Sequence, residues 1–429
     1  MPRIVLINPW VHDFSAYNLW SAPMGLYKTL EYLSAYDAEL SLIDCLNAPI
    51  KPKEDGRSHI RKEKILKPHV YKSIPRYYYR FGISKEEFKI KICSLLPIDA
   101  FLITSVMSYW YPGVKETISV LKEISPRTPV ILGGIYATLY NEHAANTGAD
   151  IVYEGAVDNK LIAILSHNGI ELHPSKAMGH WSDYLGVKTH APILTSTGCP
   201  MRCTYCASHL LNPSFSQRPA HEVFQEINLL YEKGVRHFVF YDDALLMNPN
   251  EHIVPLLEMV LKNLSGVSFS TPVGIQARMI SKRLAQLMKQ TGFQYIRIGY
   301  ETHDTKRQKI TGGKIYDEDL VSAVANLKEV GFAAGDIGTF IMYGLPNQQF
   351  EEVKESVEFV KSLGVKIALT EFSPITGTAE SEKLPAAILS EPLYANNTAF
   401  SYLFSNYNDD DVKKLKVELS NHNNSVFKV

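Results

Sequence analysis

Three of the five cysteines in the 429-residue chain stand in one short stretch, at Cys199, Cys203 and Cys206. The apolar run 193–197 precedes them and is typical of a short buried strand. Gly198 and Pro200 interrupt that strand, so we expect the cysteines to lie on a loop at its end. Three thiols this close together cannot all pair as disulfides, because one is always left over. The stretch therefore indicates an inorganic centre bound at the end of a strand.

Two inorganic centres are compatible with these residues. The first is a structural zinc ion, for which His209 could supply a fourth ligand after Cys206. The second is a [4Fe-4S] cluster held by three thiolates, in which one iron has no protein ligand and can bind a substrate or cofactor. Zinc ligands usually come as two short pairs far apart in the sequence, so the spacing of these cysteines favours the cluster.

The pattern Cys199-x3-Cys203-x2-Cys206, with the aromatic Tyr205 just before the last cysteine, resembles the signature of the radical SAM enzymes. The resemblance implies that the cysteines ligate a [4Fe-4S] cluster whose open iron binds the amino and carboxylate groups of S-adenosylmethionine. It also implies an external one-electron reductant, because one electron from the cluster cleaves a carbon–sulfur bond of S-adenosylmethionine and releases a 5′-deoxyadenosyl radical.

From residue 193 onward, six apolar stretches are typical of strands, and all but the last are followed by a helical pattern. They are 193–197, 237–241, 267–271, 295–300, 338–343 and 367–372. Repeated strand–helix alternation predicts parallel strands covered by helices. This one resembles the partial (βα)6 barrel of the radical SAM enzymes, which we assign to residues 192–376. Polar or small residues follow several of these strands, at the end where barrel chemistry takes place.

The resemblance implies that residues near the strand ends bind S-adenosylmethionine. They are Tyr205, Asp242, Gln276, Arg278, Glu301 and Gly344. The tyrosine is expected along the adenine, and the glycine is expected to let the backbone approach that ring. The aspartate, or its neighbour Asp243, is expected to receive the methionine ammonium. The other three are expected to hold the methionine carboxylate and the ribose hydroxyls. For each residue the alternative is an ordinary strand-end hydrogen bond or salt bridge.

Residues 1–165 show a second strand–helix alternation. Apolar strand patterns recur at 4–7, 40–44, 100–104, 130–134 and 151–153. This alternation predicts an α/β domain with a five-stranded, doubly wound parallel sheet of the Rossmann or flavodoxin-like kind. In such a sheet the ligand crevice lies at the carboxyl ends of the strands.

The loops after these strands carry small or polar residues, namely Ser105, Gly133, Gly134, Ala137, Glu154 and Gly155. Glycines end strands whether or not a ligand binds. Together, however, the loops resemble those of the cobalamin-binding domain found ahead of many radical SAM barrels, where they receive the corrin and its nucleotide tail. The pattern departs from many such domains, because no histidine lies in Asp-x-His-x-x-Gly and His12 lacks the aspartate two positions earlier. Cobalamin, if bound, would then not be held by that histidine.

Three further segments lie outside the two alternations. Residues 51–98 interrupt the first one and are rich in lysine, arginine and tyrosine. Such a segment could bind nucleic acid, but a solvated cover packed through its tyrosines is more typical, so nucleic acid is not the expected partner. Residues 166–191 predict an interdomain linker. The extension 377–429 could cap the barrel and contact substrate, or could be a packing helix, and its sequence favours neither.

The overall composition limits the class of protein. Charged residues make up 21% and the net charge is −1, which gives no general attraction to nucleic acid or anionic membranes. No run approaches the roughly 20 apolar residues of a transmembrane segment, and the start is too short an apolar run for a signal peptide. Cys45 and Cys93 are expected to be core thiols, so no auxiliary cluster is predicted. We therefore expect a cytoplasmic protein, where thiols stay reduced.

Residues and resemblance together predict a radical SAM enzyme, and within that class a cobalamin-dependent methyltransferase acting on an unactivated carbon of a small-molecule or lipid substrate. One alternative is a radical SAM enzyme with a vestigial cobalamin domain that performs cyclisation or carbon–carbon coupling. The other is a non-catalytic zinc or iron–sulfur binding module. Nothing in the sequence identifies the substrate.

Overall fold

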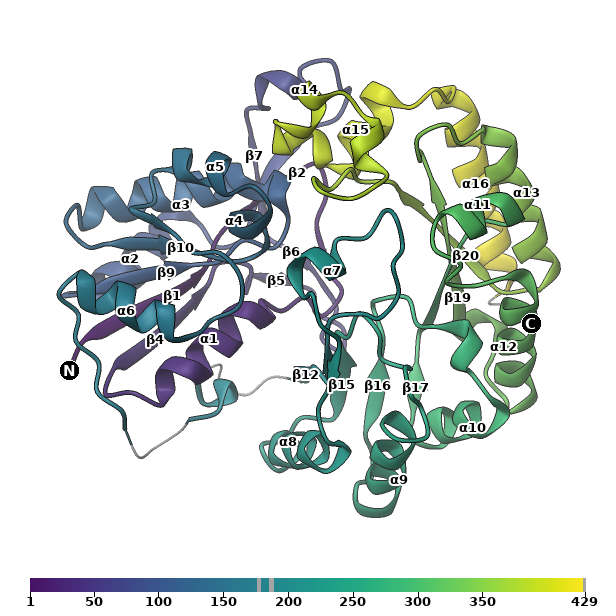
Figure 1. Ribbon diagram of the computed structural model, residues 1–429, viewed down its shortest axis with the longest axis horizontal. Helices are drawn as coiled ribbons and strands as arrows, with labels where there is room; N and C mark the ends of the chain where they lie inside the picture. The colour runs from purple at the N-terminus through teal and green to yellow at the C-terminus, as the bar shows by residue number, and fades with distance from the viewer. Residues whose placement is uncertain (176–178, 185–188, 427–429) are drawn as a thin grey trace. The chain divides into compact units, whose positions relative to one another are not determined.

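The computed structural model describes residues 1–175, 179–184 and 189–426 (Figure 1). The chain forms two compact units. Unit 1 comprises Met1–Lys188 and Ala387–Asn396, and unit 2 comprises Thr189–Ala386 and Asn397–Val429. The predicted linker, 166–191, lies partly outside the described residues. None of the helices in the described part of the chain is long and apolar enough to cross a lipid bilayer.

Unit 1 is built on a five-stranded parallel sheet with the strand order β4-β1-β9-β10-β11. The strands are β1 (Arg3–Asn8), β4 (Glu39–Asp44), β9 (Ala100–Ile103), β10 (Val130–Leu132) and β11 (Ile151–Val152). The order reverses between β1 and β9, and the crevice of a doubly wound sheet lies at such a switch point. The predicted fold of the N-terminal part is confirmed.

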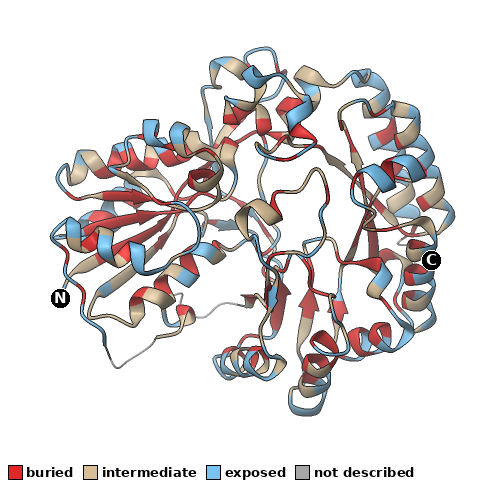
Figure 2. Ribbon diagram, viewed as in Figure 1, coloured by how far each residue is buried: buried red, intermediate tan, exposed pale blue. Residues whose placement is uncertain are grey.

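Helices cover both faces of this sheet (Figure 1). They are α1 (Met24–Ser34), α2 (Lys85–Ser94), α3 (Tyr111–Ile124) and α6 (Asn159–His167). Val5 and Ile7 of β1 pack in one core with residues of α2 and α3, and Figure 2 shows how burial concentrates on the strands. Cys45 is buried as predicted, but the prediction for Cys93 is wrong. Cys93 follows the buried Ile92 on α2, and one helical step turns its side chain toward solvent.

The interrupting segment forms two small antiparallel sheets with the chain after β1. One joins β2 (Val11–Asp13), β8 (Tyr78–Phe81) and β7 (Lys62–Ile65); the other joins β3 (Tyr17–Asn18), β6 (Ser58–Ile60) and β5 (Pro49–Ile50). Tyr71 and Tyr78 are almost fully buried, while Lys62 and Lys64 lie over the rings of Tyr79 and Tyr77. The segment is a cover packed through its aromatic residues.

Unit 2 carries six parallel barrel strands with helices outside them (Figure 1). The strands are β12 (His190–Ile193), β15 (His237–Phe240), β16 (Ser268–Ser270), β18 (Ile296–Glu301, preceded by β17, Phe293–Gln294), β19 (Ile337–Tyr343) and β20 (Lys366–Glu371). A parallel bridge between Ile275 and Ile298 joins the two halves of the sheet. The helices are α8 (Ala220–Glu232), α9 (Ile253–Asn263), α10 (Lys282–Gln290), α11 (Thr305–Ile310), α12 (Asp317–Glu329) and α13 (Phe350–Ser362).

The first barrel strand lies earlier than its predicted range 193–197. β12 ends at Ile193, and Ser196–Thr197 form β13, which pairs antiparallel with β14 (Ser216–Gln217). The chain leaves the barrel sheet because the N–H of Thr195 donates to the Asp242 carboxylate and its C=O accepts from Arg218 N–H. The residues before the cysteines are thus turned out of the sheet.

The C-terminal extension divides between the units. Residues 387–396, which include the 3₁₀ turn Pro392–Ala395, belong to unit 1, where the C=O of Leu393 accepts from Tyr71 Oη and the side chain of Asn396 donates to Asp13. The extension also forms α14 (Ala386–Leu389), α15 (Asn397–Phe404) and α16 (Asp409–Val426).

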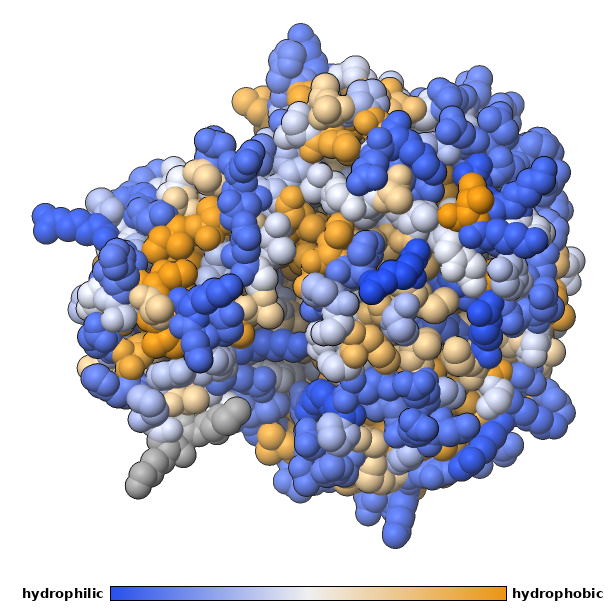
Figure 3. Space-filling model, viewed as in Figure 1, coloured by the Kyte–Doolittle hydropathy of each residue, from blue (hydrophilic) through white to orange (hydrophobic). Residues whose placement is uncertain are grey.

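Helix α16 packs against β20, the last strand of its sheet. The Asn423 amide donates to Ile367 C=O at 2.8 Å and accepts from Ile367 N–H at 2.9 Å, as a neighbouring strand would. Lys416 also pairs with Glu371 at 2.7 Å. The helical exterior of unit 2 is largely hydrophilic in the view of Figure 3. This part of the tail is a packing helix that satisfies a strand edge.

Candidate active site

The three cysteines lie in one loop directly before helix α7 (Ser208–Leu211). Cys203 is buried, and Cys199 and Cys206 are half-buried. Burial raises the pKa of all three thiols, and the charge of Cys203 raises the pKa of Cys199 and Cys206 further. Among the described residues, no three His, Cys, Asp or Glu side chains are gathered tightly enough to hold a single metal ion. A four-iron cluster spreads its ligands further apart than one zinc ion does.

Two glycines give the loop its shape. Gly198 has φ +76°, and a Cβ there would lie 2.5 Å from Ser214 C=O. Gly312, in the turn after helix α11, packs against the loop with φ +114°. A Cβ there would lie 2.9 Å from Arg202 C=O. Only glycine adopts these conformations at so close an approach without cost.

A buried ion pair lies beside the thiols. Lys314 Nζ is 2.9 Å from Glu301 Oε1, and both side chains are less than one-fifth exposed. Burial alone would lower the pKa of Lys314. The negative charges of Glu301, Cys203 and Cys206 outweigh burial, so the pKa of Lys314 is raised. Lys314 thus puts a positive charge beside the cysteine loop. Sequence reasoning missed this residue; the only local signal is its position directly after the Gly312–Gly313 turn.

The neighbouring aspartates Asp242 and Asp243 have different surroundings. Oδ1 of Asp242 accepts from Thr195 N–H, Thr195 Oγ1 and Ser196 Oγ at 2.9, 2.8 and 2.6 Å. Burial raises the pKa of Asp242 to about 6 despite these bonds, and its Oδ2 has no hydrogen-bond partner. Asp243 Oδ2 instead accepts from Ser208 Oγ at 2.6 Å, and its charge adds to burial in raising the pKa of Cys199 and Cys206. Of the two, Asp243 lies beside the thiols.

Two predicted ligands of S-adenosylmethionine make bonds within the protein. The Gln276 amide donates to Asp243 C=O at 3.1 Å and accepts from Leu246 N–H at 3.2 Å, so it shapes the turn after β15. Arg278 pairs with Asp319 at 3.1 Å and is 40% exposed. It also donates to Gly313 C=O at 3.3 Å, which places it on the turn that carries Lys314.

Tyr205 and Gly344, the two residues expected near adenine, lie at different places in unit 2. The Tyr205 side chain is in hydrogen-bond contact with Cys203, and burial raises its pKa strongly. Gly344 follows β19 with φ +89°, and a Cβ there would touch nothing closer than Phe372 at 3.9 Å. Backbone space therefore exists at Gly344, as close approach by a ligand requires.

In unit 1 the predicted cobalamin residues gather at the carboxyl ends of β9, β10 and β11. Gly134 has φ +93° and fits tightly, since a Cβ there would lie 2.7 Å from Ser105 C=O. Gly133 has room, with Tyr153 C=O the nearest atom at 3.8 Å, and Gly155 has none within 4 Å. Ala137 is buried behind them, and Glu154 is exposed. The loops form a backbone-lined edge at Gly133 and Gly155.

His12, which follows the first strand of this sheet, is paired within unit 1. Its Nε2 is 2.8 Å from Glu116, which also pairs with the buried Arg80 at 3.0 Å. The histidine is only 7% exposed and packs edge-on against Tyr78. These contacts hold the His12 ring against Glu116 and Tyr78.

Comparison with known proteins identifies the barrel. Residues 193–360, which contain the three cysteines and Lys314, match the model of the radical SAM superfamily. This part of the chain is a radical SAM domain. The cofactors of radical SAM domains are a [4Fe-4S] cluster and S-adenosylmethionine, so the match favours the cluster over the zinc alternative.

The curated relatives that match this chain are distant. An uncharacterized methyltransferase, PH0819 of Pyrococcus horikoshii, is 28% identical over 52% of this chain and 46% of its own length. The anaerobic magnesium-protoporphyrin IX monomethyl ester cyclase of Cereibacter sphaeroides is 22% identical over 64% of this chain and 51% of its own. The chain spans about half the length of both relatives.

A solved structure shares the fold of both units. The radical S-adenosylmethionine methyltransferase TsrM from Kitasatospora setae, with cobalamin and a [4Fe-4S] cluster bound, matches with a TM-score of 0.65 at 14% identity. The match covers 90% of this chain and 78% of that one, so it includes the doubly wound unit as well as the barrel.

Proposed function

We propose that this radical SAM protein is a cobalamin-dependent methyltransferase that acts on an unactivated carbon. The observation that carries the proposal is the joint occurrence of the three-thiol loop beside Lys314 and a doubly wound unit with an open glycine edge. The likeness to TsrM in fold and the distant relationship to PH0819 support the same assignment.

The residues of the loop fit a [4Fe-4S] cluster. Cys199, Cys203 and Cys206 would ligate three irons, and the cluster supplies the electron that cleaves S-adenosylmethionine. Lys314, held by Glu301, offers a cation for the methionine carboxylate, and Asp243 offers a carboxylate for the methionine ammonium. Asp242 would keep the strand end in place through Thr195 and Ser196.

The strand ends of unit 1 fit a corrin and its tail without a histidine ligand. Gly133 and Gly155 have space beside their backbone for a ligand, and Gly134 packs tightly against the backbone of Ser105. His12 is paired with Glu116 and would stay away from cobalt. The residues nearest the ligand would therefore be backbone groups and small side chains, whose role is to bind and orient.

The cluster is tested with anaerobically reconstituted protein. We expect a broad absorption band at about 400 nm that dithionite bleaches. We also expect the protein to form 5′-deoxyadenosine from S-adenosylmethionine. The triple variant Cys199→Ala, Cys203→Ala, Cys206→Ala should lose both while keeping its circular dichroism, because the barrel has its own core. Deoxyadenosine formed by that variant would refute the assignment.

Cobalamin binding is tested with Gly133→Val. The protein itself leaves space for this side chain, so a loss of binding would report on the ligand rather than on the fold. Wild-type protein should retain about one equivalent of hydroxocobalamin through gel filtration, and the variant should retain much less. Gly25→Ala, in helix α1 with nothing within 4 Å of its Cβ, is the matched control. Retention by wild type no better than by an unrelated protein would remove the methyltransferase proposal.

Gly134→Val is a poorer test. Its Cβ would meet Ser105 C=O and Thr104 Oγ1, both at 2.7 Å, and the φ of +93° is strained for valine. The variant would disturb the loops whether or not a corrin binds.

A second candidate is radical cyclisation or carbon–carbon coupling, favoured by the similarity to the cyclase of Cereibacter sphaeroides. The two functions differ in the fate of the methyl group. With S-adenosylmethionine labelled in its methyl group, a methyltransferase places the label in the product, together with S-adenosylhomocysteine. A cyclase yields an unlabelled product. In either case we propose that the substrate is a small molecule or lipid and that an external one-electron reductant supplies the cluster.

A further inference from the structure

Thr204 stands between two of the cysteines and is bonded through all of its polar groups. Its N–H donates to Thr311 C=O at 3.2 Å, and its C=O accepts from Glu380 N–H at 3.0 Å. Its hydroxyl donates to Glu380 Oε1 at 2.9 Å. Two segments remote in sequence therefore hold the cysteine loop at one residue.

Glu380 is an unusual residue to find at this position. It is only 1% exposed, and a buried carboxylate is costly unless it is paired and hydrogen-bonded. Its Oε1 receives the Thr204 hydroxyl, and its Oε2 is 2.8 Å from Lys383 Nζ, whose side chain is 44% exposed. The lysine balances the charge from the solvent side, which leaves the other oxygen directed at the loop.

The segment that carries Glu380 is itself fixed. The buried hydroxyls of Thr378 and Ser381 are 3.0 Å apart, and both donate to Ile375 C=O. Gly377 has φ +79°, and a Cβ there would lie 3.1 Å from Leu210 in helix α7, directly after the cysteines. The segment thus contacts the chain on both sides of Cys206.

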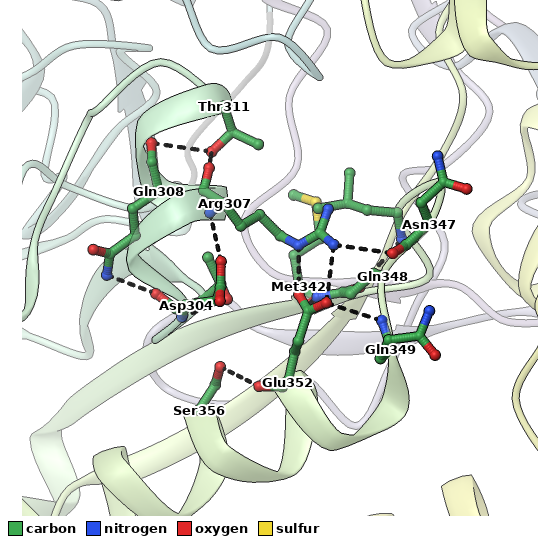
Figure 4. A network of polar contacts seen from close by, with 12 residues as sticks. Asp304, Arg307, Gln308, Thr311, Met342, Asn347, Gln348, Gln349, Glu352 and Ser356 are labelled. Atoms are coloured by element: carbon green, nitrogen blue, oxygen red, sulfur yellow. Dashed lines mark hydrogen bonds and ion pairs between the residues drawn. The ribbon is translucent and has the colours of Figure 1, made fainter.

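The opposite side of the loop rests on helix α11. The N–H and Oγ1 of Thr311 both donate to Arg307 C=O, and the Arg307 guanidinium binds Glu352 at 2.7 and 3.1 Å (Figure 4). The same guanidinium donates to Asn347 C=O at 3.2 Å. This buried network fixes the carbonyl to which Thr204 N–H donates.

We propose that Glu380 is a positioning residue, which holds Thr204 and thereby sets the placement of Cys203 and Cys206 before any cluster is bound. The inference rests on the proposed function only in giving those cysteines a cluster to hold. A loop fixed in advance binds its ligand without the conformational cost of ordering it. The side chain and the N–H of Glu380 both bond to Thr204, so Glu380 acts on the loop through that residue.

The first test needs no cluster. In apo protein, hydrogen exchange of the Thr204–Cys206 amides should be slow in wild type and about tenfold or more faster in Glu380→Ala, since a charge-assisted bond is lost. Thr204→Val removes the same side-chain bond from the other partner and should speed exchange in the same peptides. Glu382→Gln, an exposed neighbour, is the control and should leave exchange unchanged. Exchange in Glu380→Ala equal to wild type would overturn the inference.

The second test uses reconstituted protein. In Glu380→Ala, iron release to a chelator should be several-fold faster and the EPR spectrum of the reduced cluster should broaden. Glu380→Gln should restore most of the wild-type behaviour, because its amide oxygen still accepts from Thr204. A uniform loss of exchange protection throughout unit 2 would mean a general structural role and would also overturn the inference. A wild-type protein that assembles no cluster would refute the proposed function, while the exchange test would still judge Glu380.

Discussion

Replacing Lys314 by methionine probes the ion pair beside the cysteines. A methionine side chain is close to lysine in length but has no charge, so Glu301 is left buried without its partner. Breaking a buried pair costs about 3–5 kcal/mol, and both side chains here keep a small exposed fraction, so we expect a loss of about 3 kcal/mol. Gly299 leaves room for this pair, because a Cβ there would lie 2.7 Å from Lys314 Nζ.

The double variant separates the charge from the packing. Glu301→Gln alone leaves Lys314 unpaired, and the two substitutions together leave a neutral pair of similar volume. We expect the double variant to be more stable than the sum of the single losses predicts, by about 1–3 kcal/mol. Replacing both members of a buried ion pair can leave the free energy of unfolding unchanged. Removing only one member lowers it, because the other charge stays buried without a partner.

The assay is urea unfolding of the apo protein under reducing conditions. All four tryptophans, Trp10, Trp20, Trp110 and Trp181, belong to unit 1, so their fluorescence reports unit 1 while far-ultraviolet circular dichroism reports both units. The dichroism transition should move to lower urea, and the fluorescence transition should move less. Lys306→Met, an exposed lysine of α11, is the matched control, expected within about 0.5 kcal/mol of wild type. A loss for Lys314→Met as small as that of the control would refute the reasoning.

Three further outcomes are expected. Asp243→Asn should weaken the binding of S-adenosylmethionine by about 1.5–3 kcal/mol in titration calorimetry, and Asp242→Asn should weaken it less; the reverse order would return the role to Asp242. Burial raises the pKa of Asp242 from 3.8 to about 6, so the folded state holds this proton more tightly than the unfolded state and stability falls as pH rises from about 4 to 6, by at most about 3 kcal/mol. Asp242→Asn should flatten that part of the stability–pH curve, and an unchanged curve would show that burial does not govern this carboxyl. Asn423→Ala should destabilise unit 2 by about 1–3 kcal/mol, because two backbone groups of Ile367 lose their partner, whereas the exposed Asn424→Ala should be neutral in the same urea experiment.

The cysteine loop and the alternation of strands and helices were readable from the sequence because both are local. Cys199, Cys203 and Cys206 lie within one loop, so their spacing alone limits what they can bind. Five of the six barrel strands fall where runs of apolar residues place them, since a strand buried on both faces requires such a run. The alternation in unit 1 predicts a doubly wound sheet, but the order of its strands is set by their long-range pairing.

The surroundings of the site were decided by the tertiary structure. Lys314 meets Glu301, Glu380 meets Thr204 across 176 positions, and Asp242 turns toward Thr195, while its neighbour Asp243 turns toward Ser208. No local pattern distinguishes the two aspartates, because the choice depends on which hydroxyl the packed chain brings near. The first barrel strand ends early for the same reason, as Asp242 draws the Thr195 backbone out of the sheet. Spacing along the chain determines which groups can act together, and long-range packing determines the charge and hydrogen bond that each of them meets.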